Sequence, residues 1–159
     1  MSAALNHVLE SDYRSTAENK PIKNKSRKYR RILIVDDDMD TAQSIKYIAE
    51  SYGENVFCEI VCDPYEALIA LSDHEFDMLL IDQKIPGLEG TSILSKIDEF
   101  VDQDPLIIES GRYTDSIPTV IMSGSEVSLP VGFKLKNFKL ERIINKNSLP
   151  KFLSESFAN

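Results

Sequence analysis

The sequence predicts an α/β fold built on a five-stranded, doubly wound parallel sheet with helices on both faces. Short runs of consecutive apolar residues recur along the chain, and such runs are typical of parallel strands buried on both faces. Segments with helical spacing of apolar residues separate these runs. The links between them are short, and this strand–helix alternation is typical of right-handed crossovers in a parallel sheet.

The first strand is predicted at 32–35, where four apolar residues lead into an acidic cluster. A helix follows, because apolar residues recur with helical spacing until Gly53, a residue that fits a helix stop. Residues 56–61 predict a second, more exposed strand. Asp63 and Pro64 then supply an N-cap and a first helical residue, which predicts a second helix.

The third strand is predicted at 77–82, an apolar run that ends in Asp82 and is soon followed by the chain breaker Pro86-Gly87. A buried helix segment could also give such a run, but the short length and the breaker favour a strand. Residues 91–101 predict the third helix. Its core face carries four apolar side chains: Ile93, Leu94, Ile97 and Val101.

The polar segment 102–117 predicts an enlarged loop or a ragged extension of this helix. The fourth strand is predicted at 119–122, another continuous apolar run. Within 125–139 we expect only a short helix, because Pro130 and Gly132 interrupt a longer one.

Charge is distributed unevenly along the chain. The 159 residues carry a formal net charge of −8. Residues 1–31 hold eight basic against three acidic side chains, a balance of +5, which leaves −13 for the remainder. We expect 1–29 to be a flexible basic leader and 30–159 to be one domain. We do not expect so acidic a domain to bind nucleic acid directly; it is better suited to holding carboxylates around a cation.

No apolar run approaches the length that spans a membrane, and the N-terminus lacks the apolar core of a signal peptide. We therefore expect a cytoplasmic protein with no membrane partner. Cys58 and Cys62 lack the further cysteines or histidines that would complete a metal site, so we expect reduced thiols.

Four of the predicted strands lead into side chains that can take part in chemistry. These are Asp36 and Asp37 after the first strand, Asp82 on the third, Ser123 after the fourth, and Lys146 after the fifth, which is predicted at 140–145. Taken singly, each has an ordinary role as a helix cap, a turn residue or a solvated charge. Parallel strands bring their carboxyl ends to one edge of a sheet, so we expect these side chains to meet there.

Close carboxylates repel one another, and Mg²⁺, which prefers carboxylate, carbonyl and water oxygens, relieves that repulsion. A lysine and a serine hydroxyl nearby complete a cradle for a phosphoryl group. One carboxylate is then the nucleophile. Asp82, alone on its strand, fits this role, while Asp36 and Asp37 are suited to holding the metal. No Gly-rich loop follows the first strand, so the usual nucleotide-binding fingerprints are excluded.

These residues lie in motifs that resemble the receiver domain of two-component response regulators. The first-strand signature is similar to Ile-Leu-Ile-Val-Asp-Asp-Asp at 32–38, and the phosphoacceptor motif is similar to Leu-Leu-Ile-Asp-Gln-Lys-Ile-Pro-Gly-Leu-Glu-Gly at 79–90. Pro-Thr-Val-Ile-Met-Ser-Gly at 118–124 is similar to the switch strand, and Lys146 matches the family lysine in order and spacing. The resemblance covers about residues 30–157.

The resemblance implies a flavodoxin-like (βα)5 receiver fold with strand order 2-1-3-4-5. It also implies a phosphoacceptor, a set of Mg²⁺ ligands, a switch hydroxyl and a cation that contacts phosphate. By this resemblance the phosphoacceptor is Asp82, and the Mg²⁺ ligands are Asp36, Asp37, Asp82 and the backbone carbonyl of Lys84. The switch hydroxyl is that of Ser123, and the cation that contacts phosphate is Lys146.

The resemblance further implies a single-domain response regulator that takes its phosphoryl group from a histidine kinase or a histidine phosphotransfer protein. With no output domain expected in this chain, the signal would be altered binding to a downstream protein, by a monomer or weak dimer. The protein would not be an enzyme beyond self-catalysed phosphotransfer and autodephosphorylation.

Two residues depart from the family pattern. Asn147 follows the lysine where the family usually has proline, which weakens the expectation of a cis peptide there. Ile143 occupies a position that often holds Tyr or Phe. Both lie beside the face that normally signals, so we expect intact chemistry with an altered readout.

Two other functions stay open at this point. Asp36-x-Asp38, with a serine and a lysine downstream, is similar to a phosphatase of the haloacid dehalogenase class. Against this, no acidic pair follows Lys146, and Asp82 would have no role. A receiver-like interaction module that is never phosphorylated would keep the same fold, and the departures on the signalling face leave room for it.

Overall fold

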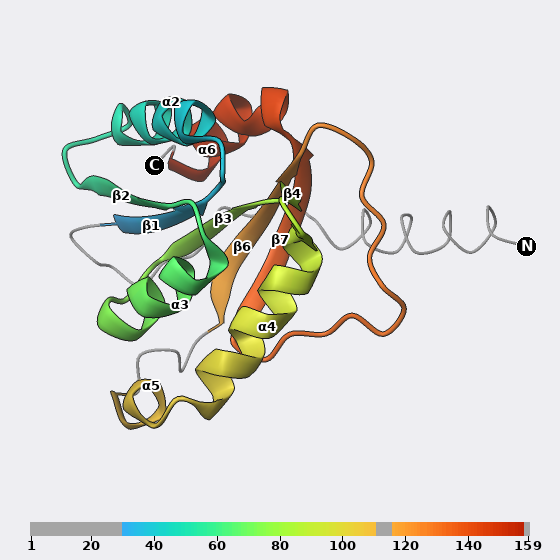
Figure 1. Ribbon diagram of the computed structural model, residues 1–159. Helices are drawn as coiled ribbons and strands as arrows, with labels where there is room; N and C mark the ends of the chain where they lie inside the picture. The colour runs from blue at the N-terminus through green and yellow to red at the C-terminus, as the bar shows by residue number, and fades with distance from the viewer. Residues whose placement is uncertain (1–29, 111–115, 158–159) are drawn as a thin grey trace, which may run out of the picture.

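The computed structural model describes residues 30–110 and 116–157, with a five-stranded parallel sheet at their centre (Figure 1). The strand order β2-β1-β3-β6-β7 is 2-1-3-4-5 when the strands of this sheet are counted along the chain. The predicted fold class is therefore confirmed, while the predicted leader lies outside the described residues. The strands are β1 (Arg30–Val35), β2 (Val56–Val61), β3 (Met78–Asp82), β6 (Ile117–Ser123) and β7 (Phe138–Asn145).

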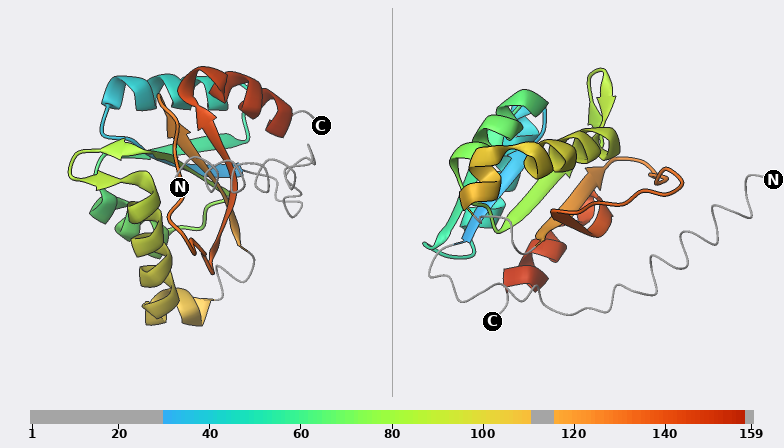
Figure 2. Two further views of the ribbon diagram at one scale, coloured as in Figure 1. Left: turned by 90° about the vertical axis from the view of Figure 1, so that its right-hand side faces the viewer. Right: turned by 90° about the horizontal axis from the view of Figure 1, so that it is seen from below.

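Helices cover both faces of the sheet (Figures 1 and 2). One face packs against α2 and α6, and the other packs against α3 and α4. The helices are α2 (Met39–Glu50), α3 (Pro64–Asp73), α4 (Gly90–Gln103), α5 (Pro105–Ser110) and α6 (Leu149–Phe157), with a 3-10 turn, η1 (Lys146–Ser148), before α6. Within the described ranges no helix is both long enough and apolar enough to cross a membrane.

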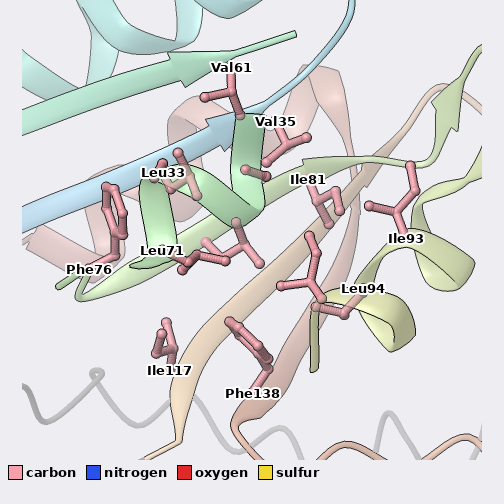
Figure 3. Close-up of a cluster of buried hydrophobic side chains, with 14 of the residues drawn as sticks. Leu33, Val35, Val61, Leu71, Phe76, Ile81, Ile93, Leu94, Ile117 and Phe138 are labelled. Carbon is pink, nitrogen blue, oxygen red and sulfur yellow. The ribbon is translucent and has the colours of Figure 1, made fainter. Parts of the chain in front are cut away.

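The sheet separates the core into two apolar layers. Figure 3 shows the layer in which Leu33, Val35 and Ile81 of the central strands meet Ile93 and Leu94 of α4. The central strands carry continuous apolar runs because helices bury them from both sides. The four residues predicted for the core face of α4 are all buried.

Local sequence explains where the helices beside the site begin. The Asp38 carboxylate accepts backbone hydrogen bonds at the start of α2. The Asp63 carboxylate accepts one from the Tyr65 N–H, and Pro64 is the first residue of α3. These are the roles that the sequence predicts, since N-caps satisfy backbone N–H groups that lack a partner inside the helix.

The short helix predicted within 125–139 was wrong. The β6–β7 segment, residues 124–137, contains turns and irregular chain but no helix. Pro130 has no N–H to donate, and Gly132 adopts a φ of +77°, so neither residue favours a helix. Two partly buried side chains of the segment pack against the core where a helix was expected: Phe133 and Leu135.

Two further elements were not placed by the sequence. Lys84–Ile85 (β4) and Leu88–Glu89 (β5) form a small antiparallel hairpin. Its turn is Pro86-Gly87, with Gly87 at φ +84°, as a proline–glycine type II turn requires. After α4 the chain forms α5, whose Ile107 is buried in the core, so the described part of 102–117 follows the second of the two expectations, an irregular extension of the helix.

Asp98 on α4 anchors the end of the β6–β7 segment. Its buried carboxylate accepts hydrogen bonds from the Lys136 N–H at 2.8 Å and the Asn137 N–H at 2.7 Å. The Asn137 side-chain amide donates to the Asp98 carbonyl oxygen. One carboxylate therefore satisfies two backbone donors just before β7.

We expect Asp98→Ala to lower the free energy of unfolding by about 2–3 kcal/mol, because it leaves two partly buried N–H groups without their charged acceptor. Urea denaturation measures the loss. Asp102→Ala, on the same helix, is the matched control, since it breaks only the exposed ion pair between Asp102 and the Lys136 side chain. Equal unfolding midpoints for the two variants would contradict the anchoring role.

Candidate functional site

Three carboxylates meet at the edge of the sheet where the parallel strands end. Asp36 follows β1 and is fully buried, Asp37 is exposed beside it, and Asp82 is the last residue of β3. Each offers an oxygen, and these oxygens lie within 4.8 Å of one another. The structure thus brings together the three acidic side chains predicted to meet.

Lys146 reaches this cluster from the end of the edge strand β7. It is the first residue of η1, directly after β7. Its Nζ lies 2.9 Å from Asp36 Oδ2 and 3.2 Å from Asp82 Oδ1. The predicted convergence of the lysine and the acids is therefore observed.

Asp36 and Asp38 serve different purposes, although they are two residues apart. Asp36 Oδ1 accepts the Asp38 N–H at 3.0 Å, while its other oxygen binds the lysine. Asp38 instead accepts hydrogen bonds from the Thr41 hydroxyl and N–H, and these bonds lower the pKa of its carboxyl. Asp38 is thus a helix cap at the rim of the site.

Ser123 ends β6 at the same edge as the acids. Across β3 and β6, Asp82 pairs with Met122, so Ser123 lies one residue beyond the partner of Asp82. The hydroxyl is buried and accepts a hydrogen bond from the Ser125 N–H at 3.1 Å. It can still donate its own proton, because a hydroxyl donates and accepts at once.

Lys84 contributes through its backbone. Its N–H faces the Asp82 carboxylate closely enough to lower the pKa of that carboxyl. Its carbonyl belongs to β4, two residues past Asp82, and its side chain is exposed. The hairpin of β4 and β5 therefore begins at the rim of the acidic cluster.

The buried charges of the site perturb one another. Burial raises the pKa of Asp82 and the Asp36 charge raises it further, while Lys146 and the Lys84 N–H partly offset this. Burial opposes the ionisation of Lys146, but hydrogen bonds and attraction to the two carboxylates outweigh burial and raise its pKa. The lysine is therefore held as a cation beside Asp82, a carboxyl that is costly to ionise.

The structure shows the contacts of Asn147 and Ile143, the two residues that depart from the family pattern. No cis peptide occurs among the described residues, so the Lys146–Asn147 bond is trans. The Asn147 N–H, which a proline would lack, donates to the Asn145 side chain at 2.9 Å. Asn145 is the N-cap of η1, so this bond caps the start of the 3-10 turn. Ile143 is partly buried and packs against the core layer beside α4.

Gln83 and Gly90 matter more here than their sequence suggested. Gln83 is buried, and its side-chain Oε1 accepts the Thr91 N–H at 3.2 Å. A Cβ added to Gly90 would lie 2.4 Å from the Asp82 carbonyl oxygen. The available signals were a polar residue directly after a buried strand and a glycine at the start of a helix, and neither specifies a partner.

Comparison with known proteins decides the family, because a profile of the response regulator receiver domain matches residues 32–148. The chain belongs to the response regulator receiver domain family. Response regulator MprA of Mycobacterium bovis is 27% identical over 132 residues, which cover 80% of this chain and 56% of that protein. Transcription factor SKN7 of Saccharomyces cerevisiae is 29% identical over 86 residues, which cover 54% of this chain and 14% of that protein.

Solved structures agree on the receiver fold. A CheY-like receiver domain protein from Methanospirillum hungatei aligns with a TM-score of 0.55 and 25% identity, over 81% of this chain and 94% of its own. CheY4 of Vibrio cholerae aligns with a TM-score of 0.54 and 18% identity, over 80% and 98% of the two chains. This receiver chain spans about half the length of MprA and a smaller part of SKN7.

We expect Asp82→Asn to stabilise the metal-free receiver domain at neutral pH, because ionised Asp82 is buried beside another carboxylate. Its raised pKa makes the wild type lose stability as pH rises above the ordinary value of 3.8, where folded Asp82 holds a proton that the unfolded chain has lost. The gain of the variant should therefore shrink as pH falls toward 3.8.

Thermal unfolding in the presence of a chelator measures this gain, at roughly 2–4 °C per kcal/mol for a domain of this size. Glu109→Gln, at an exposed position of α5, is the control and should leave the midpoint unchanged at every pH. A lower midpoint for Asp82→Asn at neutral pH would contradict the charge assignment.

Proposed function

We propose that this receiver domain accepts a phosphoryl group on Asp82 from the phosphohistidine of a kinase or phosphotransfer protein and signals by altered protein binding. One observation carries the proposal. The Asp82 carboxylate sits at a strand end with the Lys146 ammonium 3.2 Å away and two further carboxylates within 4.8 Å. In this proposal 30–159 is the receiver unit and 1–29 is a basic leader.

The acidic cluster fits Mg²⁺ in its chemistry. Asp36, Asp37 and Asp82 supply carboxylate oxygens, and the Lys84 carbonyl is a further hard oxygen beside them. Asp36 already binds Lys146 and a backbone N–H, yet its oxygens keep further lone pairs for a metal. When bound, the ion supplies positive charge that neutralises phosphoryl oxygens.

The phosphoryl step is a displacement at phosphorus. An Asp82 oxygen forms the new O–P bond while the N–P bond to the donor imidazole breaks. The imidazole leaves with that electron pair and takes up a proton. The Lys146 ammonium balances charge on the transferred group, and the Ser123 hydroxyl donates a hydrogen bond to it. The only chemistry assigned to the chain is this self-catalysed transfer and the later loss of phosphate.

Phosphorylation places new negative charge at the junction of β3 and β6. A Ser123 hydroxyl that turns toward this charge gives up the Ser125 N–H, with which it now makes a hydrogen bond. The change then passes into the β6–β7 segment, which is irregular chain where a helix was expected. We assign the output to protein contact by a cytoplasmic monomer or weak dimer, without direct binding of nucleic acid or membrane.

The phosphatase alternative finds little support at the site. Asp38, the second acid that it requires, accepts hydrogen bonds from Asp40 and Thr41 as the cap of α2. Asp82, which it leaves unused, makes the contact to Lys146. The remaining alternative, a receiver-like module that is never phosphorylated, is an outcome of the next experiment.

We expect the wild type to gain the mass of one phosphoryl group when it is incubated with Mg²⁺ and acetyl phosphate, and Asp82→Asn to gain none. Intact-mass spectrometry gives the result. Asp38→Asn is the matched control, because it removes a nearby carboxylate that only caps a helix, and it should still gain the mass. Chelation of Mg²⁺ should prevent the gain.

Equal phosphorylation of Asp82→Asn and the wild type would contradict Asp82 as the acceptor. If the wild type gained no mass from acetyl phosphate or from a panel of histidine kinases, the unphosphorylated interaction module would be the remaining function.

A further inference from the structure

Gln83, the residue after the proposed phosphoacceptor, is held at three points. It is only 7% exposed. Its N–H donates to the Met122 carbonyl at 2.8 Å, and its own carbonyl accepts the Gly90 N–H at 2.8 Å. Its side-chain Oε1 accepts the Thr91 N–H at 3.2 Å. Backbone and side chain together therefore tie this residue to β6 on one side and to α4 on the other.

Through this side chain Gln83 caps a helix from outside it. The first N–H groups of a helix need acceptors, which the residue at the N-cap usually supplies. Glu89 occupies that position in α4 but makes no side-chain cap hydrogen bond. Oε1 of Gln83 takes the N–H of Thr91, the second residue of the helix, instead. The start of α4 thus depends on a residue of the phosphoacceptor strand end.

The start of α4 also lies directly against the phosphoacceptor backbone. A Cβ on Gly90 would come within 2.4 Å of the Asp82 carbonyl oxygen and 2.9 Å of Gln83 Cα. Only glycine allows this approach without a backbone shift. The end of β3 and the first turn of α4 are consequently packed as one unit, with Gln83 at their junction.

The geometry of the acceptor carboxylate depends on this junction. The Lys84 N–H lies close enough to the Asp82 carboxylate to lower the pKa of that carboxyl. Gln83 alone lies between the two residues, so its backbone torsions set the direction of the Lys84 N–H. A side chain that fixes Gln83 therefore fixes the backbone groups nearest the acceptor, beyond what strand pairing alone provides.

We propose that Gln83 is a positioning residue: by capping α4, its side-chain amide holds the 82–84 backbone in the conformation in which Asp82 accepts a phosphoryl group. This inference rests on the proposed function and adds a residue to which that function assigned no role. It also makes α4 an element coupled directly to the acceptor, through contacts that do not involve Ser123 or Lys146.

The test separates positioning from capping with three variants. Gln83→Met keeps the length and apolar bulk of the side chain but removes the acceptor oxygen. Glu89→Asn places a strong capping side chain at the N-cap itself, and the double variant combines the two changes. Thr91→Val is the matched neighbour control, because the buried Thr91 hydroxyl has no hydrogen-bond partner among the described residues and its N–H is kept.

We expect Gln83→Met to lower the thermal midpoint and to slow phosphorylation by acetyl phosphate about 10-fold or more, since small misplacements of reacting groups are costly. The double variant should recover the midpoint while phosphorylation stays slow. Glu89→Asn and Thr91→Val should phosphorylate at the wild-type rate. If the double variant recovered the phosphorylation rate together with the midpoint, the positioning role would be overturned and Gln83 would be a helix cap only. A wild-type phosphorylation rate in Gln83→Met would lead to the same conclusion.

Amide hydrogen exchange of Lys84, followed by NMR in metal-free protein, gives a readout that needs no phosphorylation. Exchange should be faster in Gln83→Met and in the double variant than in the wild type, and unchanged in Thr91→Val. Unchanged exchange in Gln83→Met would overturn this inference alone. A wild type that exchanges as expected but never gains a phosphoryl group would instead overturn the proposed function, and with it the functional part of the inference.

Discussion

The contact of Lys146 with Asp36 and Asp82 is the interaction on which the rest of the site depends. Both carboxylates are buried, and two buried acids side by side are unfavourable unless a cation balances them. Lys146 follows the last strand, whereas the acids follow β1 and end β3. The contact therefore requires the complete sheet, with its strand order and register, and it makes the folded domain and the candidate site inseparable.

Around this ion pair, the loops differ in how firmly they are tied to the site. The β6–β7 segment is attached at its start by the Ser123–Ser125 contact and at its end by the hydrogen bonds to Asp98. Between those points it has no helix of its own. In a receiver domain this places an irregular segment beside the hydroxyl proposed to sense the phosphoryl group. A change at Ser123 can then reach a surface whose conformation is not fixed by helical hydrogen bonds.

The acceptor strand has a second connection, to α4, through Gln83 and the close approach of Gly90. This connection is made of backbone contacts and one buried amide, and it does not involve Ser123. The chain thus joins its acceptor to two elements on the same face of the sheet. Identity to receiver domains of known structure is low, yet the fold is shared.

The sequence alone determined the parts of this protein that follow from local pattern. Continuous apolar runs identify the buried strands, acids directly after 32–35 and at Asp82 mark the strand ends, and the Asp63-Pro64 pair marks a helix start. Because all strands are parallel, their carboxyl ends share one edge, so the meeting of Asp36, Asp82 and Lys146 could be predicted without coordinates. Each of these predictions needs only the spacing of residues along the chain.

Only the tertiary structure decided what depends on contacts between distant segments. Nothing near Gln83 in sequence shows that its amide caps a helix, since its partner Thr91 lies eight residues away around a hairpin. The absence of a helix in 124–137 likewise depends on packing and on an anchor, Asp98, that comes from another helix. Local propensity sets where helices and strands can form, whereas buried polar partners are chosen by whichever donors and acceptors the packed core brings together.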